Sequence, residues 1–290
     1  MIAKLENQFV SVEVQSKGAE LYSLILKEDS TEYLWQADPR YWPRRAPVCF
    51  PIVGILPNGQ YKVGGETFAL SVHGFARDME FDIIENHPDE IIYRLTYDTE
   101  TLGIFPFRFQ LDIGYRLIKN ELSVEYKVKN LDDQGMHFSI GAHPGFMCPI
   151  LPEENFTDYQ LIFEKNETAY RNHVNNGLLS GITELVLQEY NTIPLTKALF
   201  KNDVLIFKNL KSEAITLKSQ KSGKWVTVAF KGFPYLGIWT KPDESPFVCI
   251  EPWYGVTDTP GDSKQFSEKE GIQVLLSGQE FNSSYRISIG

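Results

Sequence analysis

Apolar and polar side chains alternate with a period of two residues along much of this 290-residue chain. The clearest run covers residues 122–129 (LSVEYKVK), where Leu, Val, Tyr and Val alternate with Ser, Glu, Lys and Lys. Because successive side chains of a β-strand point to opposite faces of a sheet, such a segment buries one face and exposes the other. This period predicts antiparallel strands.

Similar alternation recurs in residues 91–98, 107–117, 214–219, 225–230 and 285–289. The four residues QKSG at 220–223 separate two of these segments and are typical of a hairpin connection. With 21 Gly and 16 Pro spread through the chain, long runs of helical periodicity are hard to find. We therefore expect an all-β sandwich or barrel, mainly of antiparallel strands. Residues 148–200 are the least regular, and we expect the few short helices there.

The composition favours a globular protein that does not bind nucleic acid. Hydrophobic residues make up 42% of the chain and charged residues 23%, as in ordinary water-soluble domains. The formal net charge of −10 opposes non-specific attraction to phosphate backbones. No low-complexity linker, internal repeat or abrupt change in charge divides the sequence, so residues 1–290 are expected to form one domain.

Cys49, Cys148 and Cys249 are widely spaced and lack a CxxC partner. This spacing favours buried, reduced thiols over a disulfide framework or a zinc site. The first residues lack the charged and apolar segments of a secretory signal, and no later stretch approaches about 18 consecutive apolar residues. We expect a cytoplasmic protein that does not associate with membranes.

Four segments depart from the simple strand pattern, because rare polar residues stand among glycine, proline and aromatic residues. They are RRAPVCFPIVG (44–54), HGFAR (73–77), GAHPGF (141–146) and CIEPWYG (249–255). In order and spacing, and together with NDVLIF (202–207) and EKEGIQVLLSGQEF (268–281), they resemble the aldose 1-epimerase family in its LacX-type branch. The resemblance covers nearly the whole chain. It implies a galactose mutarotase-like β-supersandwich, a twisted two-layer fold that holds a hexose in an open cleft.

The resemblance also implies roles for particular residues. His143 in GAHPGF matches the family's general acid, and Glu251 in CIEPWYG matches its general base. His73 in HGFAR matches a second histidine that contacts the substrate. Asp203 in NDVLIF matches a carboxylate that binds sugar hydroxyls, although an Asp after Asn is equally typical of a turn.

Arginine and tryptophan residues complete the expected sugar site. Arg44 matches the family's active-site arginine, but a one-residue shift of the alignment would select Arg45 instead. Arg77 in HGFAR is a further cationic candidate, and any of these arginines could instead pair with surface acids. Trp239 is a candidate for stacking on a sugar face, with core packing as an equally weighted alternative.

The implied reaction is the interconversion of hexose anomers. Ring opening needs a base that takes the C1 hydroxyl proton and an acid that protonates the ring oxygen. It gives a metal ion or an organic cofactor no task, so we expect neither. The expected partner is a small sugar, and the sequence leaves open whether the protein is a homodimer.

Three other functions compete with this interpretation. A hexose-6-phosphate 1-epimerase would use the arginines to bind phosphate. A non-catalytic carbohydrate-binding or regulatory protein would keep the cleft without accelerating anomer exchange. A glycoside hydrolase is a more distant alternative, because that chemistry usually needs two carboxylates and no second acid shares the motif context of Glu251.

Overall fold

The computed structural model describes residues 1–261 and 263–290, and β-strands dominate this part of the chain. The strands are β1 (Ile2–Glu6), β2 (Val10–Gln15), β3 (Glu20–Leu26), β4 (Thr31–Glu32), β5 (Val48–Cys49), β6 (Gln60–Val63), β7 (Glu66–Ala69), β8 (Asp82–Asn86), β9 (Glu90–Thr96), β10 (Phe109–Ile118), β11 (Glu121–Asn130), β12 (Met136–Phe138), β13 (Ile140–Ala142), β14 (Gly145–Met147), β15 (Tyr159–Asn175), β16 (Leu178–Pro194), β17 (Leu205–Lys208), β18 (Ala214–Ser219), β19 (Trp225–Ala229), β20 (Tyr235–Trp239), β21 (Phe247–Tyr254), β22 (Gln273–Leu275) and β23 (Glu280–Ile289).

Helical structure is short wherever the chain is described. The α-helix α1 (Thr99–Ile104) begins after Asp98, whose side chain accepts a hydrogen bond from the Thr101 N–H at 2.7 Å. Such a cap satisfies one of the backbone donors left free at a helix start. The 3₁₀ helices are η1 (Pro57–Gly59), η2 (Ala76–Asp78), η3 (Phe156–Asp158), η4 (Lys197–Phe200) and η5 (Phe266–Glu268).

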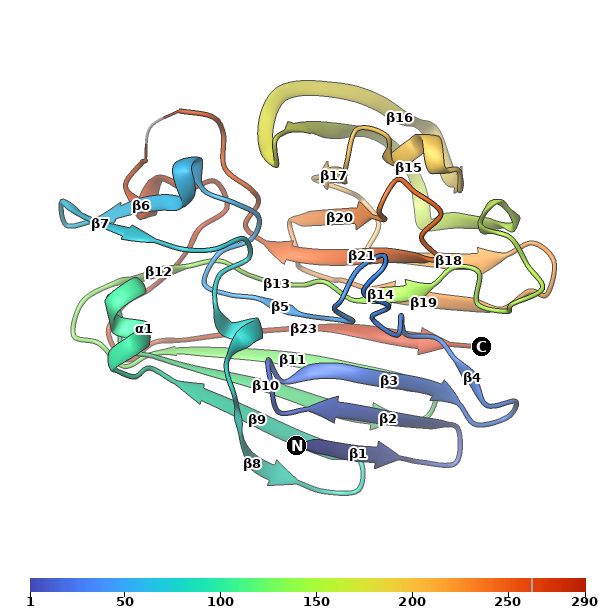
Figure 1. The fold of residues 1–290 in the computed structure, drawn as a ribbon, viewed down its shortest axis with the longest axis horizontal. Helices are drawn as coiled ribbons and strands as arrows, with labels where there is room; N and C mark the ends of the chain where they lie inside the picture. The colour runs from blue at the N-terminus through green and yellow to red at the C-terminus, as the bar shows by residue number, and fades with distance from the viewer. Residues whose placement is uncertain (262) are drawn as a thin grey trace.

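The strands form one large sheet and one smaller sheet (Figure 1). Within the described residues, the large sheet has 15 strands, and its path runs β5-β13-β21-β20-β17-β15-β18-β19-β23-β11-β10-β9-β8. From this path, β14 pairs with β21 and β16 pairs with β15. The smaller sheet has the order β1-β2-β3-β4, and short pairs join β6 to β7 and β12 to β22.

The smaller sheet packs on the β9–β11 part of the large sheet, which makes a two-layer β-sandwich. Buried side chains from both sheets, among them Val12 and Ile113, belong to one hydrophobic core. Two tyrosine hydroxyls cross between the layers: that of Tyr93 donates to the Val14 carbonyl at 3.0 Å, and that of Tyr115 donates to the Ala19 carbonyl at 2.7 Å. These bonds satisfy polar groups that would otherwise be costly to bury.

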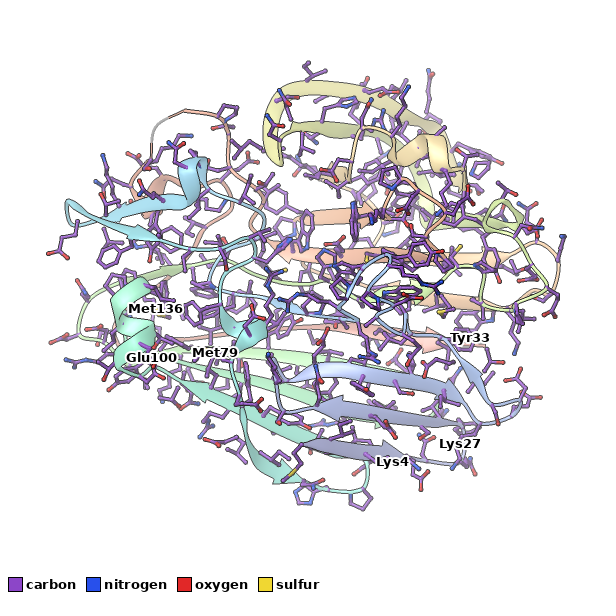
Figure 2. All side chains as sticks on the ribbon, in the orientation of Figure 1. Lys4, Lys27, Tyr33, Met79, Glu100 and Met136 are labelled. Carbon is purple, nitrogen blue, oxygen red and sulfur yellow. The ribbon has the colours of Figure 1, made fainter. Side chains whose placement is uncertain are left out.

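Lys4 of β1 and Lys27, which follows β3, lie on the smaller sheet (Figure 2). Lys4 and Lys27 both approach Glu6, with Nζ–Oε2 distances of 3.0 and 3.5 Å. Tyr33, by contrast, is fully buried, and its hydroxyl donates to the backbone carbonyl of Gly290 at 2.8 Å. This bond ties the segment after β4 to the end of β23.

The six alternating segments are strands, as predicted. They correspond to β9, β10, β11, β18, β19 and β23. Leu122, Val124, Tyr126 and Val128 are buried as the period requires. The QKSG connection joins β18 to β19, which pair in antiparallel register. Ser123 is the exception on the polar face: it is buried, and it pairs with Arg286 of β23.

The expectation for residues 148–200 is largely wrong. This stretch holds the two 17-residue strands β15 and β16, together with η3 and η4, while α1 lies elsewhere. The register of the β15–β16 pair shifts at several points, for instance between Ile162 and Glu167. Each such irregularity leaves one or more residues without a direct partner and interrupts the two-residue period. The alternation therefore disappears from the sequence although the strands are long.

The prediction of buried, unpaired thiols is confirmed, because Cys49, Cys148 and Cys249 are all free and buried. Among the described residues, no helix has both the length and the hydrophobicity needed to cross a membrane.

Candidate active site

Two neighbouring strand segments bring His143 and Glu251 together. Both β13 and β14 pair with β21, through Gly141 opposite Trp253 and Gly145 opposite Cys249. The register is the same in both pairings, so the intervening residue His143 lies opposite Glu251. Side chains at facing positions of neighbouring strands lie within contact distance.

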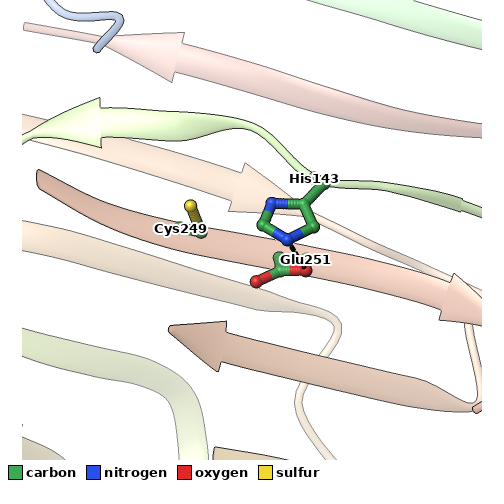
Figure 3. Close-up of side chains that lie close together, drawn as sticks. All are labelled: His143, Cys249 and Glu251. Carbon is green, nitrogen blue, oxygen red and sulfur yellow. Dashed lines mark ion pairs between the residues drawn. The ribbon is translucent and has the colours of Figure 1, made fainter. Parts of the chain in front are cut away.

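The two side chains point toward each other from neighbouring strand segments (Figure 3). His143 Nε2 lies 3.0 Å from Glu251 Oε2, and the residues are 8% and 1% exposed. The ring N–H is not aligned with the carboxylate, and neither Glu251 oxygen has a hydrogen-bond partner among residues 1–261 and 263–290. Both groups are thus close together, yet each keeps its bonding capacity for another molecule.

Burial disfavours the charged form of each partner. Removal from water lowers the pKa of His143 to about 3, with a further contribution from the positive charges of Arg77 and Arg44. Burial raises the pKa of Glu251 well above its usual value, and the negative charge of Asp203 adds to this effect. This burial therefore favours a neutral imidazole beside a protonated carboxyl group.

His73 lies next to His143, at a ring-centroid distance of 5.2 Å and perpendicular to it. Its Nδ1 accepts a hydrogen bond from the Gly54 N–H at 3.1 Å and also contacts Cys49 Sγ at 3.2 Å. Burial lowers the pKa of His73 well below its usual value, so the ring is neutral. With Nδ1 as acceptor, the ring proton resides on Nε2, which can act as a donor.

The backbone of HGFAR is tightly constrained around this histidine. His73 adopts a left-handed conformation with φ of 61°. The next residue, Gly74, has φ of 75°, and a Cβ atom there would lie 2.2 Å from the Phe50 carbonyl oxygen. The Phe50 N–H donates to the His73 carbonyl at 3.1 Å. These contacts require glycine at position 74 and fix His73 beside β5.

A pocket of about 290 Å³ opens over the His143–Glu251 pair. Its volume is near the lower end of the roughly 300–1,000 Å³ range of small-molecule sites. Six of the residues proposed from the sequence line it: His73, Arg77, His143, Asp203, Trp239 and Glu251. The fold thus gathers residues from five separate stretches of the chain.

Asp203 and Trp239 occupy the wall near this pair. Asp203 is exposed, has φ of 69°, and accepts a hydrogen bond from the Val204 N–H at 2.9 Å. It is therefore both the turn residue and the pocket carboxylate that the sequence left as alternatives. Trp239 is half-buried, and its ring lies 5.8 Å from that of His143 at 78°.

The arginines differ from the expectation based on the motif at residues 44–54. Neither Arg44 nor Arg45 lines the pocket, whereas Arg77 does. The guanidinium of Arg44 pairs with Asp78 at 2.8 Å, and that of Arg45 lies over the Tyr22 ring at 3.8 Å. Arg77 Nε is buried without a hydrogen-bond partner among the described residues, and it lies 3.7 Å from the Asp78 carboxylate.

Several pocket residues were not anticipated from the sequence. Trp42 precedes the RRAPVCFPIVG motif by two residues, and Thr257 follows CIEPWYG. Val174 and Gly177 come from the tip of the β15–β16 hairpin. An NNG turn signal at 175–177 is the only local indication of that tip, and nothing in the sequence indicates which part of the molecule it approaches.

A third buried group lies beside the pair. The ligand atoms of His143, Cys249 and Glu251 all lie within 4.8 Å of one another, so these residues could hold a metal ion (Figure 3). Cys249 and Glu251 share one face of β21 because they are two residues apart. Burial raises the pKa of the Cys249 thiol well above its usual value, so metal binding would first have to remove a tightly held proton.

The arrangement suits proton transfer. One imidazole and one carboxyl group, 3.0 Å apart and shielded from water, can accept and donate protons at adjacent atoms of a bound molecule. Apolar walls with a few polar groups are also typical of pockets that bind small molecules.

Comparison with known proteins gives a consistent result. The family model described as aldose 1-epimerase matches residues 1–269. The chromosomally encoded protein LacX of Lactococcus lactis subsp. lactis is 33% identical over 298 residues, covering 100% of this chain and 99% of LacX.

Two solved structures resemble the whole chain. A galactose mutarotase related enzyme from Lactobacillus acidophilus has a TM-score of 0.96 at 33% identity, covering 100% of this chain and 97% of that one. A galactose mutarotase-like protein from Lactobacillus casei has a TM-score of 0.95 at 32% identity, with 100% of both chains covered. The expected galactose mutarotase-like sandwich is thereby confirmed.

Proposed function

The chain belongs to the aldose 1-epimerase family, and from this premise we propose that it interconverts the α- and β-anomers of an unphosphorylated hexose. The observation that carries the proposal is the buried His143–Glu251 pair that lines the pocket, 3.0 Å apart, with both Glu251 carboxyl oxygens free of hydrogen bonds to the described residues.

In the proposed reaction, Glu251 is the general base and His143 the general acid. Glu251 takes the proton of the C1 hydroxyl while His143 protonates the ring oxygen, and the bond between C1 and the ring oxygen breaks. Rotation about the C1–C2 bond presents the other face of the aldehyde. The two proton transfers then run in reverse and close the ring as the other anomer.

The proton balance of this scheme suits a buried pair. Opening the ring moves one proton onto Glu251 and removes one from His143, so the pair holds a single proton throughout. The pair begins as carboxylate and imidazolium and ends as carboxyl group and neutral imidazole. Burial favours the neutral state, and hydroxyl donors of the bound sugar would favour the charged one by bonding to the free carboxylate oxygens.

The remaining pocket residues receive orienting roles. His73 presents Nε2–H as a donor, Asp203 accepts hydrogen bonds from hydroxyls, and Arg77 offers a cation beside the histidines. Trp239 supplies an apolar face for the sugar ring. Such groups contribute by holding the substrate in a reactive geometry.

The charges at the pocket favour a free hexose over a hexose 6-phosphate. Arg77 is the cation among its lining residues, and the carboxylate of Asp203 faces the same space. Arg44 is already engaged by Asp78, and Arg45 by Tyr22. A phosphate group usually requires several cationic or backbone donors around its oxygens.

The decisive test is anomer exchange followed by polarimetry or by NMR of the anomeric proton. Fresh α-galactose, α-glucose and their 6-phosphates are compared with the purified protein and with Glu251→Gln. We expect faster equilibration of a free hexose, and a loss of about 10²–10⁴-fold in the variant. Saturable sugar binding without any acceleration would contradict the enzymatic proposal and favour a binding or regulatory role. Preference for the 6-phosphates would contradict the proposed substrate class.

A further inference from the structure

His143 has an unusual environment for a catalytic imidazole. Its Nδ1 is buried and has no hydrogen-bond partner from another residue in the described part of the chain. In many enzymes the second ring nitrogen donates to a carboxylate or carbonyl, and that bond fixes the orientation of the ring. Among the described residues, no carboxylate or carbonyl of another residue supplies such a bond to His143, so packing must orient the imidazole.

The ring of Trp42 is the flat surface nearest to His143. Its centroid lies 4.9 Å away, and the two planes differ by 31°, whereas Trp239 and His73 meet the imidazole nearly edge-on, at 78° and 90°. A nearly parallel neighbour restricts rotation of the imidazole most directly, because a turned ring would collide with it.

Trp42 is itself held in place on several sides. Its ring stacks on Phe247 at 5.5 Å and 21°, and meets Trp239 edge-on at 5.7 Å. The Trp35 indole N–H donates to the Trp42 carbonyl at 2.8 Å. A Cβ atom on Gly145 would lie 3.0 Å from Trp42 Cζ3, so glycine at 145 permits the close approach.

The loop that carries Trp42 is attached at both ends to the segment that carries His143. The Trp35 N–H donates to the Gly145 carbonyl at 2.9 Å, and the Gly145 N–H donates to the Arg45 carbonyl at 2.8 Å. Gly145 is two residues from His143. The position of Trp42 relative to the imidazole is therefore fixed by backbone hydrogen bonds as well as by side-chain packing.

We propose that Trp42 is a positioning residue for the epimerase reaction, in which its indole holds the His143 imidazole beside Glu251 and excludes water from that side of the pair. This inference rests on the proposed function. It assigns to an aromatic face the orienting role that a hydrogen-bonded carboxylate has in other enzymes.

The charged and titratable groups around His143 determine how it responds to loss of the indole. Glu251 and Cys249 face it from β21, His73 from the HGFAR segment, and Arg77 and Arg44 act through their positive charges. Burial is the largest cause of the lowered pKa of His143. Admitting water where the indole stood should therefore raise this pKa toward the ordinary value of about 6.5.

The test compares Trp42→Ala, Trp42→Phe and Trp42→Leu with Tyr41→Ala as the matched control. Tyr41 is the adjacent aromatic residue; it meets Trp35 edge-on at 6.1 Å and does not line the pocket. For Trp42→Ala we expect kcat to fall by about 10–100-fold, since a misplaced catalytic group can cost about 10²-fold. In the same variant, KM should change less than kcat, and the acid limb of the pH profile should move to higher pH. Trp42→Phe, which keeps a flat ring, should recover most of the rate. Trp42→Leu, which fills space without a flat ring, should recover less, and Tyr41→Ala should retain wild-type kinetics.

A second measurement does not depend on catalysis. The pKa of the His143 ring is measured by NMR titration of the protein and of each variant without sugar. The ring signal is assigned by its disappearance in His143→Asn. A higher pKa of His143 in Trp42→Ala and Trp42→Leu, with the Phe variant closer to wild type, supports the proposal even if no hexose proves to be a substrate. An unchanged titration, or a higher KM with unchanged kcat and acid limb, would overturn it and leave Trp42 as a sugar-binding surface.

Discussion

His143 Nε2 lies 3.0 Å from Glu251 Oε2, and the two residues occupy facing positions on neighbouring strands of the large sheet. The relationship depends on the backbone ladder rather than on flexible loops. Sites carried by strands are held more precisely than sites on loops, and the proposed proton transfers need that precision. Both groups are also buried, so each interaction between them is strengthened by the scarcity of water.

The activity should depend on pH as a property of the pair. The active form holds one proton, so kcat/KM should fall on the acid side when the pair gains a second proton and on the alkaline side when it loses its last one. Because burial lowers the pKa of His143 to about 3, the acid midpoint should lie well below the ordinary imidazole value of about 6.5. The raised pKa of Glu251 displaces the alkaline limb upward from the ordinary carboxyl range. A pH–rate profile of the wild-type protein tests this, and an acid midpoint at or above 6.5 would show that the imidazole is not shielded from water.

The two catalytic substitutions should be strongly non-additive. His143→Asn and Glu251→Gln should each reduce kcat by about 10²–10⁴-fold. The double variant should be little worse than the slower single variant, because each partner is useful only when the other can complete the transfer. Single-turnover or polarimetric rates of the wild type, the two single variants and the double variant complete the double-mutant cycle. Calorimetric measurement of sugar binding shows whether the pocket is intact in each variant. Multiplicative losses would indicate that the residues act independently.

Asp203→Asn should change both substrate binding and the alkaline limb. Loss of the carboxylate should raise KM for a hexose, since a sugar hydroxyl loses its charged acceptor. The negative charge of Asp203 raises the pKa of Glu251, so its removal lowers that pKa and should move the alkaline limb to lower pH. Asp133→Asn, an exposed substitution outside the pocket lining, is the control and should alter neither quantity. An unshifted alkaline limb in Asp203→Asn would mean that Glu251 does not govern that limb.

Gly237→Ala should destabilise the strand that supports Glu251. Gly237 pairs with Glu251 between β20 and β21, and an added Cβ would lie 2.4 Å from Trp253 Cη2. Overpacking of this kind costs roughly 1–3 kcal/mol in the free energy of unfolding. Gly103→Ala in α1, where a Cβ meets nothing within 4 Å, should instead stabilise by about 0.5–1 kcal/mol. Denaturant unfolding of both variants measures the difference, and equal stability would mean that the Trp253 ring moves without cost.

Local pattern accounts for much of what could be predicted. The two-residue alternation identified six strands, because a strand with one face in the core shows its burial directly in sequence. It did not reveal β15 and β16, where bulges interrupt the period. The short motifs around His73, His143 and Glu251 indicated residues that line the pocket. Glycine, proline and polar residues are unusual within an apolar strand, and together they indicate a functional site rather than core packing.

The sequence by itself determined the strand-rich architecture, the family and most of the polar residues of the pocket. The tertiary structure decided that Arg77 rather than Arg44 or Arg45 lines the pocket, and that Trp42 lies over His143. The sequence also did not predict that burial favours the neutral forms of His143 and Glu251. The reason is physical: periodicity and motifs record the local environment of each residue, whereas contacts and proton affinities depend on which distant strands and loops pack against it.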